Sequence, residues 1–391
     1  MAFRFTTRFI TSTASAFATF ATLATLALPV SSHAADLVFG QIASQTNPTS
    51  AVNAKGMAVG IQAYFDKVNA GGSLQGNKLK LVTLDDGLQG PKMVEMTQQL
   101  IADPAVVGLL GFLNSAGLAE IAKQDLPGKN GIALIAPLQG DKNVVSATNV
   151  FPLRSGYADE VATLLKEAKT WGKDTLAIVN MNVAFGPPLA QLTTQLGSAQ
   201  GFTIATHQVL DTAPDKMEAS VAAAVAAIGK TRPKGIVLLA AGKPATEFVK
   251  AVRDAPGGSV QIYGLSVLLH DVLVSAVGAD KARGIVLSQA VPFPFVPSKP
   301  VITEYQSDMK KYAPGEPLSF SSLEGYMGAK IAVEAVRRAG KTPTRANILQ
   351  ALSNLGEYNL GGLFVNYSAS QRKGWGGVDL AIISASGDLR K

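Results

Sequence analysis

Short apolar segments alternate with amphipathic segments along most of this 391-residue chain. The apolar segments are rich in Val, Ile and Leu, as buried strands are, and the segments between them carry apolar residues at helical spacing. In residues 158–169, for example, Val161, Leu164 and Leu165 fall on one face of a helix. This alternation predicts parallel sheets covered by helices, which is an α/β fold. The predicted strands are 37–42, 79–84, 106–111, 132–136, 176–179, 203–209, 236–240, 261–264 and 285–288.

The alternation breaks at residues 291–297, where three prolines stand among Val and Phe. Prolines at this density exclude a helix or a central strand, so we expect a stiff irregular connector. Two helices are expected after it, at 301–311 and 323–339, and Ser321 and Glu324 are predicted to form the capping box of the second. The chain is too long for one small core, and we expect two lobes.

Residues 1–34 have the pattern of a secretory signal peptide. Arg4 and Arg8 precede a largely apolar run, Pro29 breaks it, and small residues up to Ala34 suit a cleavage site. The alternative is a retained membrane anchor, because the run nearly reaches spanning length, but several threonines dilute it. We expect cleavage after Ala34. The chain has no cysteine, hence no lipid-attachment site and no disulfide, so we expect a protein that diffuses freely in a periplasm.

The composition argues against several function classes. The net charge is +7, but lysines and arginines are spread singly and do not form the cluster that nucleic-acid binding requires. Outside the predicted signal peptide only His207 and His270 remain, which disfavours a histidine metal site, and no Gly-x-Ser-x-Gly elbow occurs. We therefore expect no catalysis, no metal and no cofactor.

Residues 67–81 carry the most specific local pattern. The stretch reads as the end of a helix, a stop at Gly71 and Gly72, a tight turn and a strand, and an acidic pair at 85–86 precedes Pro91. In this order the residues resemble the opening of the leucine/isoleucine/valine-binding proteins, the type I periplasmic solute-binding components of ABC importers. The resemblance covers essentially all of the chain after the signal peptide.

The resemblance implies two doubly wound parallel-sheet lobes joined by a three-crossover hinge. Such a protein holds a small molecule in the cleft between its lobes and delivers it to an inner-membrane ABC permease; we expect a monomer. The implied first lobe comprises residues 35–152 and 289–361, and the second comprises 153–288 and 362–391. The implied crossovers lie near 151–154, 286–289 and 361–363.

The loop at residues 111–117 is the best candidate for ligand contact in the first lobe. Backbone N–H groups at the start of a helix, with the hydroxyl of Ser115, can hold a carboxylate. Asn114 or Ser115 could equally be an ordinary helix N-cap. The resemblance favours binding, because the family holds its ligand's carboxylate in this loop. It also implies a contact segment at residues 137–140, where Gly140 stands in place of the usual threonine.

The second lobe departs from the pattern that the family uses for amino acids. The loop after the strand 261–264 usually carries an acid that meets the ligand's ammonium group, but here it reads Leu265-Ser266-Val267. Phe185 stands for a usual tyrosine, and Tyr157 for an aspartate. A buried ammonium group without an anionic partner costs several kcal/mol. We therefore expect a ligand without one, such as a carboxylate or an amide, unless Asp159, Glu160 or Asp271 replaces the missing acid.

These arguments predict a periplasmic solute-binding protein for a small organic molecule. The ligand is either branched-chain amino acid-like or, as we favour, free of an ammonium group. The alternatives are a ligand-sensing receptor component of the same fold and an exported hydrolase. The resemblance adds Asn53 to the site, because a cleft residue of the family commonly follows the opening strand; Asn53 could equally start a helix. The candidate ligand-binding residues are Asn53, Asn114, Ser115, Ala116, Leu138, Gln139, Gly140, Tyr157, Phe185 and Ser266.

Overall fold

A computed structural model describes residues 1–7, 36–47, 50–72, 74 and 76–391. The chain divides into two units, Met1–His33 and Ala34–Lys391, and the account below concerns the second. The predicted signal peptide and its cleavage site fall largely on residues 8–35, outside the described part. Among the described residues, no helix is both long and apolar enough to cross a membrane.

The first sheet has five strands in the order β2-β1-β3-β4-β5, and all its pairings are parallel. Its core strand β3 is buried along its whole length, as expected for a sheet covered on both faces. The strands are β1 (Asp36–Ile42), β2 (Lys78–Leu84), β3 (Val106–Leu110), β4 (Leu134–Ile135) and β5 (Val150–Phe151). The helices between them are α1 (Ala51–Gly71), α2 (Gly90–Ala102), α3 (Ser115–Gln124), α4 (Leu126–Lys129) and α5 (Lys142–Val145).

The second sheet has seven strands in the order β15-β14-β10-β9-β8-β6-β7. Strands β6 to β10 pair in parallel, and the C-terminal strands β14 and β15 add an antiparallel edge. The strands are β6 (Thr175–Met181), β7 (Thr203–Leu210), β8 (Gly235–Leu239), β9 (Gln261–Gly264), β10 (Val286–Gln289), β14 (Asp379–Ile383) and β15 (Leu389–Arg390). The helices here are α6 (Tyr157–Thr170), α7 (Gly186–Ala199), α8 (Pro214–Thr231), α9 (Gly242–Asp254), α10 (His270–Val277) and α11 (Ala279–Ala282).

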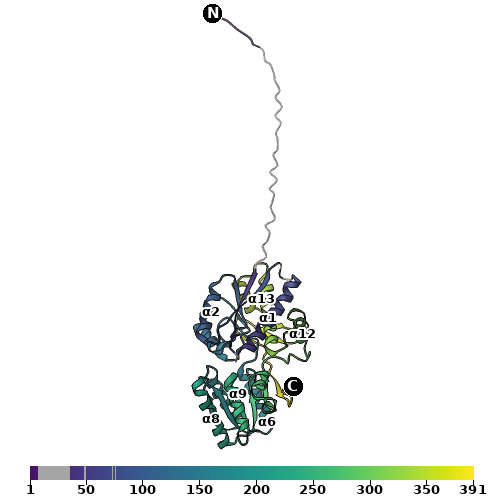
Figure 1. The fold of residues 1–391 in the computed structure, drawn as a ribbon. Coiled ribbons are helices and arrows are strands. Elements are labelled where there is room, and N and C mark those ends of the chain that lie inside the picture. The colour runs from purple at the N-terminus through teal and green to yellow at the C-terminus, as the bar shows by residue number, and fades with distance from the viewer. Residues whose placement is uncertain (8–35, 48–49, 73, 75) are drawn as a thin grey trace. The chain divides into compact units, whose positions relative to one another are not determined.

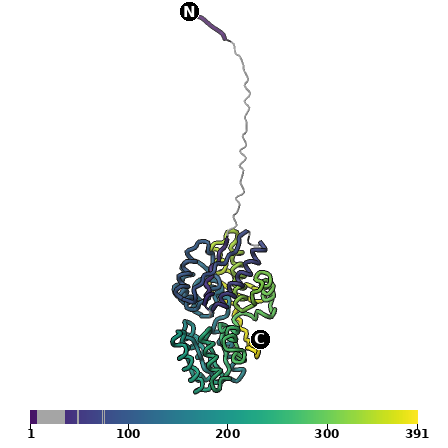
Figure 2. The backbone as a smooth tube through the Cα atoms, viewed as in Figure 1, coloured from purple at the N-terminus to yellow at the C-terminus, as the bar shows by residue number. Residues whose placement is uncertain are grey.

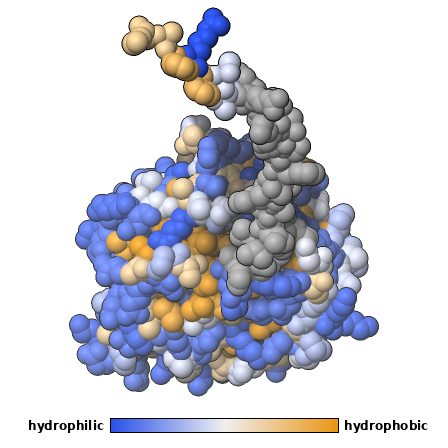
Figure 3. All heavy atoms as spheres, turned by 90° about the horizontal axis from the view of Figure 1, so that it is seen from above, coloured by the Kyte–Doolittle hydropathy of each residue, from blue (hydrophilic) through white to orange (hydrophobic). Residues whose placement is uncertain are grey.

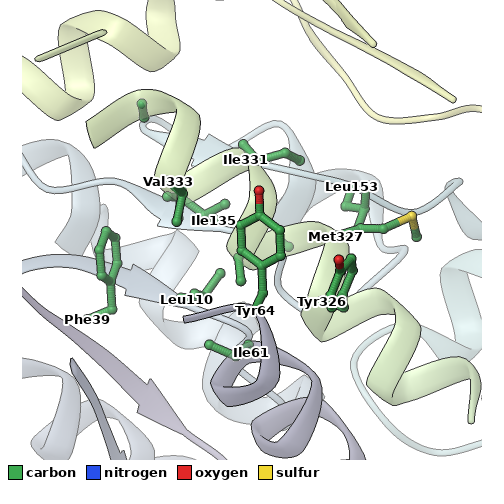
Figure 4. Close-up of a cluster of buried hydrophobic side chains, with 14 of the residues drawn as sticks. Phe39, Ile61, Tyr64, Leu110, Ile135, Leu153, Tyr326, Met327, Ile331 and Val333 are labelled. Carbon is green, nitrogen blue, oxygen red and sulfur yellow. The ribbon is translucent and has the colours of Figure 1, made fainter. Parts of the chain in front are cut away.

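After strand β10 the chain returns to the first sheet, so that segments far apart in sequence pack together (Figures 1 and 2). Helix α13 lies against α1, and an ideal Cβ on Gly60 of α1 would be only 1.9 Å from the Ser322 carbonyl oxygen. Figure 4 shows Tyr64 and Ile61 of α1 beside Tyr326, Met327 and Ile331 of α13. The returning elements are α12 (Pro300–Tyr312), α13 (Phe320–Ala339), α14 (Arg345–Ser353) and the small antiparallel sheet of β11 (Gly356–Asn359), β12 (Phe364–Tyr367) and β13 (Arg372–Lys373).

Separate hydrophobic cores lie around the two sheets. One large cluster combines α1, α13 and residues of the first sheet, and another combines α6 with strands β6 and β8 to β10. A smaller cluster, which includes Met93, Leu109 and Leu118, lies on the other side of the first sheet. Figure 3 shows one face of the molecule, on which polar residues surround a smaller apolar area.

Three passes of the chain lie side by side where the two sheets are connected. The Ser155 amide donates to the Ala290 carbonyl (3.5 Å), its hydroxyl donates to the Gly377 carbonyl (2.5 Å), and the Trp375 amide donates to the Leu153 carbonyl (2.8 Å). The lobe boundaries given above stay a prediction. Val365 and Tyr367 of β12, which the prediction places in the second lobe, pack within the first core.

The α/β fold with parallel-sheet lobes is as predicted, and each predicted strand corresponds to an observed one. The predicted capping box of Ser321 and Glu324 is wrong. The helix begins at Phe320, and its box is made by Ser319 and Ser322. Glu324 lies one turn further along, where it is buried and faces Arg154.

Candidate ligand-binding site

A cavity of about 440 Å³ lies where residues 140–145, 152–159, 185–192 and 372–376 meet. This volume is in the range of pockets that hold small organic molecules. Its walls come from the loop after β4, the first turn of α6, the first turns of α7 and the end of the β12–β13 hairpin. The first three contain predicted site residues, and the fourth contains none.

Gly140, Tyr157 and Phe185 are predicted residues that the structure brings together in this cavity. The rings of Tyr157 and Phe185 pack with centroids 5.1 Å apart, and both side chains are buried. An ideal Cβ on Gly140 would lie 2.6 Å from the Tyr157 ring, and the Tyr157 amide donates to the Gly140 carbonyl (2.9 Å). A threonine at 140 would collide with this ring, so Gly140 and Tyr157 fit each other. Burial raises the pKa of Tyr157 far above its ordinary value, although Arg154 opposes the shift.

Leu138 and Gln139 hold the loop that leads to Gly140. Leu138 packs into the first core, and Gln139 is buried with its Oε1 accepting from the amides of Gly140 (2.9 Å) and Asp141 (3.1 Å). Neither side chain lines the cavity. A direct contact between either residue and a ligand stays a prediction.

Asn114 caps helix α3 in the structure. Its Oδ1 accepts from the amides of Ala116 (3.1 Å) and Gly117 (3.2 Å), and its Nδ2 donates to buried Asp86 (2.7 Å). Two amides of the predicted carboxylate cradle are therefore already bonded within the protein. Ser115 and Ala116 lie in the first turn of α3, apart from the cavity, and their role in binding stays a prediction.

Asn53 lies in the first turn of α1, also apart from the cavity. Its Oδ1 accepts a hydrogen bond from the Ser321 hydroxyl (2.8 Å). This bond joins the first turns of α1 and α13, which is a structural role for a residue predicted to meet the ligand. The two roles are compatible, and the second stays a prediction.

Ser266 is bonded to Glu160 through both its amide (2.8 Å) and its hydroxyl (3.0 Å). Glu160 is fully buried in α6, and its Oε2 also accepts from the Ser288 hydroxyl (2.6 Å). The carboxylate therefore joins the loop after β9 to strand β10. The sequence predicts that Glu160 lies in the first turn of a helix or meets the ligand's ammonium group. Neither prediction includes its hydrogen bonds to Ser266 and Ser288.

Arg154 and Glu324 form an ion pair beside this network, with Nε and Oε1 3.1 Å apart and side chains 5% and 1% exposed. Burial raises the pKa of Glu324, and the attraction of Arg154 opposes the shift. Burial lowers the pKa of Arg154, but Glu324 and Glu160 outweigh it and the net change is upward. Arg154 thus stays charged and is neutralised within the protein.

Cationic side chains that sequence reasoning missed also border the cavity: Lys142, Arg372 and Lys373. Arg372 and Lys373 form strand β13, more than 200 residues after Tyr157 along the chain. No local motif in the sequence marks them, because their position depends on the pairing of β13 with β12. Within the described part of the chain, no group of His, Cys, Asp and Glu residues could hold a metal ion.

Comparison with known proteins agrees with the fold and the family resemblance. The model of the periplasmic binding protein family matches residues 37–387. The Leu/Ile/Val-binding protein homolog 7 of Brucella suis is 23% identical over 335 residues, which cover 82% of this chain and 81% of that protein.

Solved structures also share the fold. A substrate-binding periplasmic protein from Ralstonia solanacearum has a TM-score of 0.82 and 25% identity, covering 91% of this chain and 99% of that one. The fatty acid ABC transporter substrate-binding protein from Thermomonospora curvata has a TM-score of 0.78 and 18% identity, covering 91% of each chain. The family model matches residues 37–387, and the two-sheet fold agrees with it: this chain belongs to the periplasmic binding protein family.

Proposed function

We propose that this protein captures a small organic carboxylate or amide that has no free ammonium group, and delivers it to an inner-membrane ABC permease. It works in the periplasm as a monomer and performs no reaction on its ligand. The affinity comes from enclosing an apolar body against Tyr157 and Phe185 and from a few placed polar groups.

The bonding of Glu160 is the observation that carries this proposal. An ammonium group buried in the site needs an anionic partner. The loop Leu265–Val267 supplies no acid, and Glu160 behind it already accepts from Ser266 and Ser288 with both oxygens. Glu160 also lies near the internal cation Arg154, and its negative charge helps to raise the pKa of that arginine.

The other acids considered as substitutes are engaged elsewhere. Asp159 accepts from the Gly156 amide (3.3 Å) as part of the cap of α6. Asp271 is exposed and accepts from the Val272 amide (2.9 Å) in the first turn of α10. To meet a ligand's ammonium group, Asp159 would have to leave the cap of α6, and Asp271 would have to leave the Val272 amide in the first turn of α10.

The names of the related proteins do not identify the ligand of this one. The Brucella protein is named for leucine, isoleucine and valine, which carry an ammonium group. The Thermomonospora protein is named for fatty acids, which do not. Because both share this fold, the residues at the site have to decide between them.

Calorimetric titration with ligands that differ only in their polar groups tests the proposal. Leucine, 4-methylpentanoate and 4-methylpentanamide share one apolar body, and only leucine has an ammonium group. We expect the acid or the amide to bind and leucine to bind at least about tenfold more weakly, since a tenfold ratio needs only 1.4 kcal/mol. Phenylacetate and phenylacetamide extend the comparison to an aromatic body that suits Tyr157 and Phe185.

The same titrations include a Ser115→Ala variant, which tests the predicted contact at α3. Leucine bound more tightly than both analogues would contradict the proposed ligand class, and an unchanged affinity in Ser115→Ala would remove Ser115 from the site. Recovery of the bound molecule unaltered after long incubation separates a binding protein from a hydrolase.

A further inference from the structure

The charged side chains around the 440 Å³ cavity are not equivalent. Its two acids are used locally: Asp141 accepts from the Asn143 amide (2.8 Å) and Asp159 from the Gly156 amide (3.3 Å). Among the ion pairs of the described residues, none includes Lys142, Arg372 or Lys373. The cavity therefore carries three cations without an acidic partner.

Arg372 is held in place without being neutralised. Its Nη2 donates to the Ala147 carbonyl (3.3 Å), and its guanidinium group lies over the Phe151 ring, 5.7 Å from the centroid. Its Nε is buried and has no hydrogen-bond partner in the structure. Arg372 also lines the cavity, so its positive charge lies beside the space that a ligand would occupy.

The next residues fix the same segment against the hinge. The Trp375 amide donates to the Leu153 carbonyl (2.8 Å), and an ideal Cβ on Gly374 would lie 2.5 Å from that oxygen. Lys373 lies over Gly376, with its Cε 3.3 Å from an ideal Cβ there, and both residues line the cavity. The two cations of β13 are thus presented from a backbone that close contacts hold in position.

Another part of the cavity lining is apolar. Tyr157, Phe185, Leu189 and Leu192 form it. Helix α6 also begins at this part of the lining, and the partial positive charge at the start of a helix favours an anion. A molecule with an acidic end and an apolar body would match both the cationic and the apolar residues of the lining.

We propose that Arg372 and Lys373 recognise the acidic group of the ligand, with Lys142 assisting, while its apolar body packs against Tyr157 and Phe185. This inference rests on the proposed function and narrows it, because it selects organic anions over neutral amides. It also assigns the C-terminal hairpin a part in specificity.

The test compares an acid with its own amide in two double variants. The wild-type protein should bind phenylacetate or 4-methylpentanoate at least about tenfold more tightly than the matching amide. The amide has no negative charge, so it cannot form the charge-assisted hydrogen bonds that the acid forms with these cations. Arg372→Gln/Lys373→Gln should remove most of that difference and leave the amide's affinity unchanged. Lys92→Gln/Lys129→Gln removes two exposed lysines outside the cavity and should behave as wild type.

Two further measurements guard against a folding artefact. Arg372→Lys keeps the charge and should retain the preference for the acid, and thermal unfolding of every variant checks that the fold is intact. Added salt should weaken binding of the acid more than that of the amide.

The outcomes separate this inference from the proposal on which it rests. Equal binding of acid and amide by the wild type, or an unchanged acid affinity in Arg372→Gln/Lys373→Gln, would overturn the assignment of β13 while the proposed function stands. Failure of acids, amides and amino acids alike to bind would overturn both.

Discussion

At the scale of single residues, Glu160 connects the loop after β9, strand β10 and the buried arginine at the hinge. Glu160→Gln keeps the size of the side chain but removes its charge and one of the acceptors that Ser266 and Ser288 use. We expect the free energy of unfolding to fall by about 1–3 kcal/mol, the usual cost of leaving a buried polar group without its partner. Urea unfolding of the variant measures this change.

Glu247→Gln is the matched control for that experiment. Glu247 is an exposed residue of α9. The same chemical change there should alter stability by no more than about 0.5 kcal/mol. Equal effects of the two substitutions would mean that the bonds of Glu160 contribute nothing beyond those of a surface carboxylate.

The individual site residues show which contacts a sequence can reveal. Gly140, Tyr157 and Phe185 follow strands whose ends meet, so the strand order that the resemblance implies also brings them together. Asn114 fits a helix N-cap and a ligand contact equally well in sequence, and only coordinates show where its amide group bonds. Arg372 and Lys373 could not be identified, because the pairing of a late hairpin fixes where they lie.

At the scale of elements, the contact between α1 and α13 depends on glycine. Gly60→Ala would place a Cβ 1.9 Å from the Ser322 carbonyl, a backbone atom that no side-chain rotation can move. The helices must separate, and we expect a loss of about 1–3 kcal/mol in the free energy of unfolding. Gly71→Ala is the control on the same helix, since a Cβ there meets nothing within 4 Å. It should be neutral or slightly stabilising, and a similar loss in both variants would contradict the close-contact argument.

The same helices are joined by a half-buried charge cluster, which makes stability depend on pH. Lys67 Nζ lies 2.6 Å from Glu304 of α12 and 2.8 Å from Asp308, and Lys330 of α13 also bonds Glu304. Burial opposes ionisation of Glu304, but the hydrogen bonds from Lys330 and Lys67 outweigh it and lower its pKa below the ordinary 4.5. Near the ordinary pKa of 4.5, the Glu304 carboxyl therefore binds fewer protons in the folded state than in the unfolded state. The stability that Glu304 contributes is present above pH 4.5 and is lost as the pH falls through the lower pKa of the folded state.

Glu304→Gln tests this sign. The variant should be less stable than wild type near neutral pH, and the difference should shrink below about pH 4 as the wild-type carboxylate becomes protonated. Glu316→Gln breaks a pair with Lys55, which is 66% exposed, and should change stability little at any pH. A wild-type advantage that grew in acid would show that the cluster favours the protonated carboxyl.

The elements themselves were largely predictable, because their apolar periodicity is local. The capping box of α13 was an exception. Ser321 and Glu324 match the pattern, but Ser319 also lies close enough to start the helix, and the burial of Glu324 against Arg154 decides the outcome. That contact joins residues far apart in sequence, which no local pattern records. For the same reason, sequence could not place β13 against the hinge.

At the scale of the whole molecule, the two sheets carry separate cores, and few apolar residues join them. Val267 and Phe320 pack against both large clusters. Phe320 lies at the start of α13, and its ring contacts those of Phe293 (5.8 Å between centroids) and Phe295 (5.9 Å) from the proline-rich connector. The connector thus contributes to coupling between the lobes, beyond its expected role as a stiff link.

Phe320→Ala should weaken that coupling more than it weakens either core. Each core keeps its buried residues, so we expect a modest loss of about 1–2 kcal/mol, below the 3–5 kcal/mol of a fully buried phenylalanine. Scanning calorimetry should show a broader transition, in which the calorimetric enthalpy exceeds the van't Hoff enthalpy because the lobes no longer unfold as one unit. Phe364→Ala removes a phenylalanine that is 47% exposed on β12 and should keep the wild-type shape. If Phe320→Ala lowers the midpoint but leaves the transition as sharp as before, the lobes are coupled through their three chain passes and the buried charges of Arg154 and Glu324, and the aromatic contact is dispensable.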